Sequence, residues 1–330
     1  MVLVAVAEAG ARLWAPPVEE VLFEGREGVL MRSHPTRMWA LRPGRVSGFG
    51  VRYDVDEQGL RAGALGASPR ILTLGDSSIF GHGVSEDGTL HSHLQAALGA
   101  HGVTSTVRTV GVPGYSTEQT LLLMDELGWS LEPDLLVIGN LWSDSNVDGF
   151  VDAVWLEQLG SLPQRVENAL SVSRLWTLLR SKPEEHHLRI GWIRDPDLEG
   201  HRRVPLSSYG RNLDRLVREG ASRGVGSVFL APCNAGRLRG EAAQWDVYFD
   251  AMDRVAAHHR LPRVDGCSVL QAAGVAEAEA FSDSLHPTSL VNGLYAAALA
   301  DALVTAGWPA ERLVSEAGAF EGDLVDPWWE

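Results

Sequence analysis

Short apolar runs alternate with segments of helical periodicity between residues 70 and 305. A continuous apolar run such as 71–74 is typical of a strand that is buried on both faces of a parallel sheet. In segment 289–305, by contrast, Leu290, Leu294 and Ala298 recur at four-residue spacing, which places them on one face of a helix. The same two patterns predict further strands at 106–110, 135–138, 227–230 and near 264, and further helices at 90–98, 118–127, 207–222 and 241–259.

This alternation predicts an α/β protein with three layers. Strands that are separated by helices form a parallel sheet with helices on both faces, so we expect an α/β/α domain over residues 69–330. Residues 1–68 are rich in proline and glycine and show little helical periodicity, which predicts an irregular or short-stranded N-terminal extension. Segment 51–55 within it alternates apolar and polar positions, as a half-buried strand does. Segment 145–205 carries helical patterns near 164–180 and is predicted to be an insertion or lid.

Composition and charge narrow the class of protein. Of the 330 residues, 45% are hydrophobic and 22% charged, which is ordinary for a folded globular protein. The formal net charge of -15, without a basic stripe, argues against nucleic-acid partners and against membrane-surface binding through Lys and Arg. Cys233 and Cys267 lack metal-ligand spacing. We predict that they are buried thiols, with a single disulfide left open.

The first residues of the chain allow two interpretations. Segment 2–9 is mostly apolar, but Glu8 interrupts it and no basic residue precedes it. The segment is too short to span a bilayer, and it lacks the basic start of a signal peptide. A native start and the remainder of a removed anchor are both left open. A cytoplasmic protein and a cell-envelope or secreted protein are therefore both compatible with the sequence.

The first chemical motif follows the predicted strand 71–74 and consists of Gly75, Asp76 and Ser77. In open α/β sheets, reactive groups collect beyond the carboxyl ends of the strands. A serine at that position can present its hydroxyl to a substrate and its backbone N–H to an oxyanion. Serine is a weak nucleophile on its own, so it needs a base and a group that orients the base.

The second motif supplies both groups just before the last predicted helix. Asp283 precedes His286 by three residues, so one short turn brings the carboxylate to the far nitrogen of the ring. His286 is therefore predicted to accept the proton of Ser77, and Asp283 to hold the imidazole tautomer and to stabilise its positive charge.

Together these motifs resemble those of the SGNH/GDSL family of serine esterases and acylhydrolases. Residues 75–77 resemble its Gly-Asp-Ser motif, residues 283–286 its Asp-x-x-His motif, and residues 109–115 its second motif. The resemblance covers about residues 68–308. It implies a flavodoxin-like fold, catalysis without a metal or organic cofactor, and an oxyanion hole to which Ser77 and Gly114 each contribute a backbone N–H.

The third motif departs from the family pattern. The family has Gly-x-Asn-Asp where residues 141–144 of this chain read Leu-Trp-Ser-Asp. Ser143 thus stands at the position of the oxyanion-hole asparagine, and its hydroxyl has a shorter reach than an amide. We expect Ser143 to complete the hole, with Asn140 as the second candidate and Asn146 as a further one. Loss of one oxyanion donor raises a barrier by about 2.7–4 kcal/mol.

Residues next to these motifs are expected to contact the substrate: Asp76, Trp142 and Asp144. An indole face would supply an apolar wall beside a polar site, although a tryptophan at this position also suits the protein core. Asp144 opens a segment that resembles the start of a calcium-binding loop. The twelfth position of that segment is Trp155 rather than the glutamate that such loops require, so we expect no metal there.

Each of these residues also has a purely structural interpretation. Ser77 could cap a helix, and His286 could be an ordinary turn histidine. Because the motifs occur together and in order, the sequence instead predicts hydrolysis of an ester through an acyl-enzyme on Ser77. The ester could belong to a small molecule, a glycan or a lipid. An O-acyltransferase with the same triad and a non-catalytic binding protein are the alternatives, and the altered third motif favours the latter.

Overall fold

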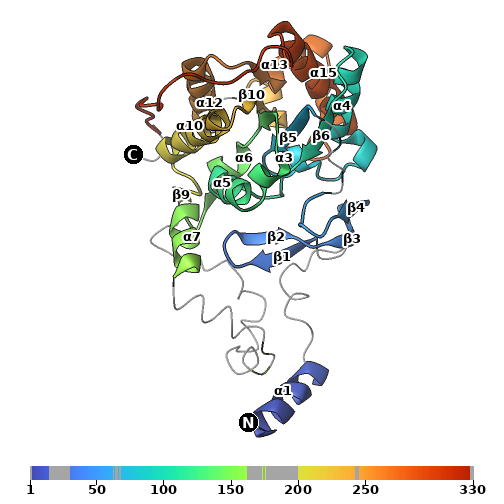
Figure 1. Cartoon of the computed structure of the whole chain (residues 1–330), viewed down its shortest axis with the longest axis vertical. Helices are drawn as coiled ribbons and strands as arrows, with labels where there is room; N and C mark the ends of the chain where they lie inside the picture. Colours follow the sequence, from blue (N-terminus) through green and yellow to red (C-terminus); the bar gives the residue numbers. More distant parts are fainter. Residues whose placement is uncertain are drawn as a thin grey trace.

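A five-stranded parallel sheet forms the centre of the protein (Figure 1). The computed structural model describes residues 2–14, 30–61, 63, 66, 68–161, 173, 175, 200–241 and 245–327. The strands are β5 (Arg70–Leu74), β6 (Thr106–Thr109), β7 (Leu135–Ile138), β10 (Gly226–Ala231) and β11 (Arg263–Asp265). Their spatial order is β6-β5-β7-β10-β11, and every neighbouring pair is parallel. This 2-1-3-4-5 order is the flavodoxin-like one, so the predicted fold class is confirmed.

Helices cover both faces of this sheet. Successive residues of a strand point to opposite sides, so strands that are apolar throughout give the sheet two apolar faces. On one face, Leu72 and Leu74 pack in a core with α5 (Thr117–Glu126), α10 (Leu206–Ser222) and α12 (Asp246–His259). On the other face, Ile71 packs in a second core with α4 (Leu90–Ala100), α13 (Gly266–Ala273) and α15 (Ser289–Thr305). The shorter helices are α3 (Ser77–Phe80), η1 (Glu86–Gly88), η2 (Gly128–Leu131), α6 (Trp142–Ser145), α11 (Ala235–Leu238) and α14 (Glu277–Ala280).

The elements predicted between residues 70 and 305 agree with the structure to within a residue or two, except that α12 begins at Asp246 rather than at residue 241. The helices expected near 164–180 lie outside the described residues. The described ends of the predicted insertion hold α7 (Asp152–Gly160) and a two-stranded ladder of β8 (Val147–Asp148) with β9 (His201–Arg202). The division of the chain into domains stays a prediction.

The N-terminal segment is more regular than its sequence pattern indicated. Residues Val2–Trp14 form helix α1, so the prediction of an irregular segment is wrong there. The segment is rich in alanine and free of proline, and Arg12 pairs with Glu8 one turn away at 2.8 Å, which favours a helix. Among the described residues, no helix has the length and apolar character needed to cross a membrane.

Two antiparallel hairpins follow α1, so this part of the extension consists of short strands. They are β1 (Met31–His34) with β2 (Met38–Leu41), and β3 (Gly44–Gly48) with β4 (Val51–Val55). In Figure 1 they lie below the sheet, on the side where α3, α5 and α6 are found. They therefore approach the edge of the sheet that carries the chemical motifs.

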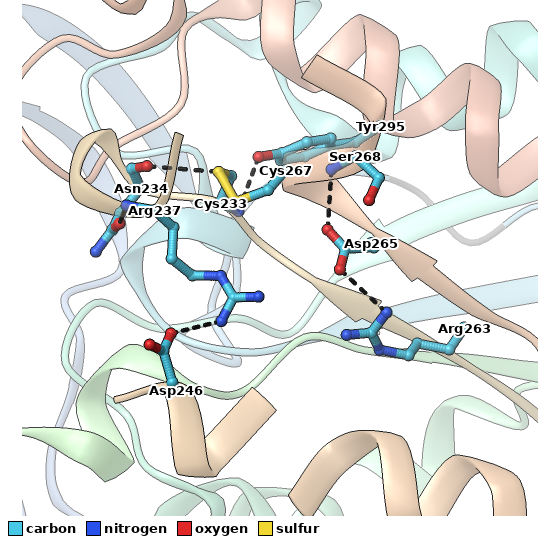
Figure 2. Close-up of a disulfide and its surroundings, with 9 residues drawn as sticks. All are labelled: Cys233, Asn234, Arg237, Asp246, Arg263, Asp265, Cys267, Ser268 and Tyr295. Atoms are coloured by element: carbon cyan, nitrogen blue, oxygen red, sulfur yellow. Dashed lines mark hydrogen bonds and ion pairs between the residues drawn. A yellow bond between two sulfur atoms is a disulfide. The ribbon is translucent and has the colours of Figure 1, made fainter. Parts of the chain in front are cut away.

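A disulfide joins Cys233 to Cys267, so the preferred prediction of two free thiols is wrong (Figure 2). The sheet register explains the pairing. Ala231 of β10 lies opposite Asp265 of β11. Cys233 follows Ala231 by two residues, and Cys267 follows Asp265 by two residues. The two Cα atoms are consequently 4.8 Å apart although 34 residues separate the cysteines in sequence. Tyr295 fixes the same loop, because its hydroxyl accepts the N–H of Cys233 at 3.0 Å.

Candidate active site

Ser77, His286 and Asp283 form a continuous chain of hydrogen bonds. The hydroxyl of Ser77 lies 2.8 Å from Nε2 of His286, and Nδ1 of the same ring lies 2.6 Å from Oδ2 of Asp283. A neutral imidazole that donates through Nδ1 accepts through Nε2, so this geometry orients the ring to accept the serine proton. The structure therefore brings together the three residues that the sequence motifs singled out, although Ser77 and Asp283 are 206 positions apart in sequence.

The end of β5 places Ser77 at the start of a helix. Asp76 caps α3, and Ser77 is the first residue of that helix, where a backbone N–H has no partner within the helix. In the described part of the chain the N–H of Ser77 donates to no other group either. Gly75 allows this tight approach, because a Cβ there would lie 2.3 Å from Cγ1 of Ile79. The serine thus presents both its hydroxyl and its free N–H.

A tight turn holds Asp283 against His286. Oδ1 of Asp283 accepts the backbone N–H of Leu285 at 2.7 Å and that of His286 at 2.8 Å. Burial by itself would raise the pKa of Asp283, but the hydrogen bonds from the ring and backbone of His286 and from Leu285 lower it to about 2. The carboxylate is therefore ionised at neutral pH and supports a positive charge on the ring.

The disulfide loop packs against this turn. The N–H of Ala235, two residues after Cys233, donates to the carbonyl of Ser284 at 3.0 Å. The turn is also closed on itself, because Ser282 donates its N–H to the carbonyl of His286 at 2.9 Å. The cross-linked end of β10 therefore supports the loop that carries the acid and the base.

Gly114 has the backbone geometry of an oxyanion donor. It lies in the left-handed region, with φ at 78°, and its N–H has no hydrogen-bond partner among the described residues. Its carbonyl accepts the guanidinium of Arg203 at 2.8 Å, which fixes the peptide. A Cβ at Gly114 would lie 3.0 Å from the indole of Trp39, so the position suits glycine in both conformation and space.

Asp76 links the first and third motifs and does not contact solvent. Its side chain is fully buried, and its oxygens accept the N–H groups of Ser78 at 2.9 Å, Trp142 at 3.1 Å and Ser143 at 3.2 Å. Burial raises the pKa of Asp76, and these hydrogen bonds oppose that shift. The prediction that Asp76 contacts substrate is wrong for this arrangement, because its carboxylate holds the loop of the third motif instead.

The two side-chain candidates for the oxyanion hole differ in their surroundings. Asn140 is fully buried, and its amide donates to the hydroxyl of Thr120 at 2.8 Å. Ser143 is 5% exposed, and its hydroxyl forms no hydrogen bond within the described part of the chain. Its backbone is fixed through Asp76. The Asn140 amide already has an acceptor in the protein, so Ser143 stays the first candidate and Asn140 the second. Asn146, the further candidate, lies just beyond α6.

The side chains of Trp142 and Asp144 are both packed in the protein interior. A substrate contact is therefore excluded for the fully buried Asp144, whereas for Trp142 it stays a prediction. Trp142 is 5% exposed and packs edge-on against Trp245 and Phe249 in the core. Asp144 is fully buried, and its Oδ1 accepts both the N–H and the hydroxyl of Thr117. Burial raises the pKa of Asp144 to about 8, although the hydrogen bonds from Thr117 act against this shift. Both side chains therefore anchor the loop of the third motif to the protein core.

Sequence reasoning missed a buried ion pair behind Gly114. Both nitrogens of one face of Arg203 bind the carboxylate of Asp152, at 2.9 and 2.7 Å, and both side chains are almost fully buried. Arg203 also donates to Gln119 at 3.0 Å, and Trp39 donates its indole N–H to the carbonyl of Pro113 at 3.0 Å. No single motif marks these residues, because Trp39 comes from the N-terminal extension, Gln119 from α5, and Asp152 and Arg203 from opposite ends of the predicted insertion.

Two groups of side chains in the described residues have a spacing that could hold a metal ion. One consists of His82, Asp283 and His286, and the other of Asp214, His258 and His259. In the first, both ring nitrogens of His286 are already used by Ser77 and Asp283. In the second, both nitrogens of His259 bind Ser315 and Asp214. Hydrogen bonds within the protein thus account for the key nitrogens in both groups.

The fold and the site together define a flavodoxin-like α/β protein that carries a Ser-His-Asp chain at the carboxyl edge of its sheet. Neither a protein-family model nor a curated protein matches this chain.

Solved structures similar to this chain include three with names that refer to hydrolases. A lipase/acylhydrolase from Enterococcus faecalis is 19% identical, with a TM-score of 0.46, over 71% of this chain and 94% of the other. An alpha/beta hydrolase from the metagenome of Lake Arreo, Spain, is 21% identical, with a TM-score of 0.48, over 72% of this chain and 95% of the other. A GDSL-like lipase from Bacteroides thetaiotaomicron is 14% identical, with a TM-score of 0.43, over 72% of this chain and 89% of the other.

Proposed function

We propose that the protein is a serine esterase of the SGNH/GDSL type. The observation that carries this proposal is the hydrogen-bonded chain from Ser77 through His286 to Asp283, at the edge of the sheet where such sites lie. The N–H groups of Ser77 and Gly114, which have no partner among the described residues, support it, because a hydrolase needs donors for a developing oxyanion.

The reaction then proceeds in two halves. His286 removes the proton from Ser77 as the hydroxyl attacks the ester carbonyl, and the N–H groups of Ser77 and Gly114, with the Ser143 hydroxyl, stabilise the tetrahedral oxyanion. His286 next gives its proton to the departing alcohol, which leaves an acyl group on Ser77. Water, deprotonated by the same ring, releases the acid and restores the serine. Asp283 holds the tautomer throughout, and no cofactor is required.

The substrate class in this proposal is a carboxylic ester of a small molecule, a glycan or a lipid. Asp76 and Asp144 are fully buried, so neither carboxylate contacts the acyl group in this proposal. The disulfide supports a location in an oxidising compartment, because structural disulfides are rare in the reducing cytosol. This favours the cell-envelope or secreted alternative.

The test is covalent labelling together with turnover. Wild-type protein is expected to react with a fluorophosphonate probe and to hydrolyse p-nitrophenyl esters. Ser77→Ala is expected to abolish both labelling and turnover. Among the described residues, no other serine bonds to Nε2 of a histidine whose Nδ1 is held by a carboxylate. Turnover by Ser77→Ala at the wild-type rate would refute the proposal. A series of p-nitrophenyl esters of rising chain length would then define the acyl group.

A further inference from the structure

Two aromatic rings, those of His82 and Phe49, follow one another outward from the ring of the candidate base. The ring of His82 lies on that of His286, with centroids 3.9 Å apart and planes 21° apart. The centroid of the His82 ring also lies 3.7 Å from that of Phe49, with the two planes 42° apart. In the described part of the chain the His82 side chain forms no hydrogen bond, and its Nδ1 is buried without a partner. Burial, with a smaller effect from the nearby His286, lowers the pKa of His82 to about 4, so the His82 ring is neutral at pH 7.

The N-terminal extension fixes the loop that bears His82. The hydroxyl of Tyr53 accepts the N–H of Gly83 at 2.8 Å, which fixes the backbone beside His82. Arg61, which is almost fully buried, donates to the carbonyls of Phe80 at 2.9 Å, Gly81 at 3.0 Å and Val84 at 2.8 Å. The loop that bears His82 is thus bound on both sides by residues that precede the α/β domain.

Phe49 occupies an unfavourable position for its residue type. It lies at the turn between β3 and β4, with φ at 55°, and the following Gly50 has φ at 78°. Two positive φ values in a two-residue hairpin define a turn that favours Asn-Gly, whereas a bulky residue in the left-handed region is rare. Phe49 is also 52% exposed. Local stability therefore does not explain a phenylalanine here, and such outliers are concentrated at functional sites.

We propose that Phe49 and His82 are positioning residues for the candidate base, and that hairpin β3–β4 thereby forms part of the active site. The Nδ1–Asp283 and Nε2–Ser77 bonds fix two directions in the plane of the His286 ring, and the stack fixes the tilt of that plane. The inference rests on the proposed function, since it assigns a role to residues around its base. Neither residue was singled out by the sequence.

The test compares four variants by p-nitrophenyl acetate turnover and by the second-order rate of fluorophosphonate labelling. His82→Ala removes both ring contacts and is expected to lower kcat and the labelling rate about 10-fold, with KM unchanged, because aromatic pairs contribute about 2- to 10-fold each. His82→Phe keeps a ring without the unpaired nitrogen and is expected to restore most of the rate. The matched control is His258→Ala. His258 also contacts a phenylalanine ring, that of Phe320, although edge-on and away from the candidate triad, so this variant is expected to keep the wild-type rate.

Phe49→Asn separates the positioning role from a structural one. Asparagine suits the left-handed turn, so the melting temperature is expected to stay the same or to rise, while the labelling rate falls about 3- to 10-fold. This variant also answers the question if His82→Ala fails to fold. A rate equal to wild type in Phe49→Asn, or a change in KM with kcat intact, would overturn the inference. A wild-type protein that neither reacts with the probe nor turns over esters would refute the proposed function itself.

Discussion

Asp283→Asn is the substitution that best tests the proposed roles in the hydrogen-bonded chain. The change keeps the shape of the side chain, and Oδ1 can still accept the N–H groups of Leu285 and His286. It places an amide NH₂ opposite Nδ1 of His286, where a carboxylate oxygen now lies at 2.6 Å. Two donors cannot share that contact, so the ring must move its proton to Nε2. A protonated Nε2 cannot accept the hydrogen of Ser77.

The size of the effect follows from this tautomer and from exposure. In a serine protease with a buried aspartate the same change costs about 10⁴-fold in kcat. The Asp283 side chain is 49% exposed, so water can solvate a rotated amide and part of that loss should be recovered. We expect kcat to fall about 10³-fold, which corresponds to about 4 kcal/mol in the barrier. The free energy of unfolding should change by less than about 1 kcal/mol, because half-exposed polar pairs contribute little.

The assay is p-nitrophenyl acetate turnover, with urea denaturation to check the fold. The control is Asp301→Asn, which removes the charge of an exposed aspartate that lies 3.0 Å from Nε2 of another histidine, His101, on the surface. The control should leave kcat unchanged. If Asp283→Asn lost less than tenfold in kcat while remaining folded, Asp283 would not hold the tautomer, and the assignment of His286 as the base would lose its main support.

Three further predictions concern the surroundings of this chain. Ser143→Ala should lower kcat by about 10-fold or more with little change in KM, while Asn140→Ala, which removes a buried bond to Thr120, should reduce stability instead; the reverse pattern would place the oxyanion donor at Asn140. Asp144→Asn should stabilise the protein at pH 8 and not at pH 4. The pKa of Asp144 is about 8 in the folded protein and lies above that of the unfolded chain, so the wild type loses stability as the pH rises from the unfolded to the folded pKa. Equal stability of the two proteins at both pH values in urea titrations would contradict this. Replacing Cys233 and Cys267 with serine should lower the free energy of unfolding by about 3–4 kcal/mol for a loop of this length, and denaturation curves that do not respond to a reductant would argue against the cross-link.

The sheet and the candidate base and nucleophile could be predicted because their signals are local. Each buried strand is a short apolar run, such as Leu135–Ile138, with glycine or proline nearby, and Ser77 and His286 lie in short motifs at strand and helix ends. Register along the chain gives the position of a residue but not the direction of its side chain. Asp76 and Asp144 were assigned to substrate contact for that reason, whereas their carboxylates turn inward to bind backbone or hydroxyl donors.

Contacts between distant segments were out of reach of sequence reasoning. Cys233 and Cys267 meet only because β10 and β11 are neighbours in a particular register. Arg203 binds the carbonyl of Gly114 across 89 residues, and no local pattern marks it. Helix α1 was missed for a different reason. The prediction for residues 1–68 rested on prolines that begin at Pro16, whereas the helix ends at Trp14 and contains no proline.

The N-terminal extension is separate in sequence but not in chemistry. Trp39 from the first hairpin binds the carbonyl next to Gly114, and Phe49 from the second lies against the ring that covers His286. The same extension therefore reaches both the candidate oxyanion donor and the candidate base. If these contacts matter for rate, residues 30–61 cannot be removed as an appendage without loss of activity even where the α/β domain folds. A boundary drawn at residue 68 from composition marks where the sheet begins, whereas the proposed site begins about thirty residues earlier.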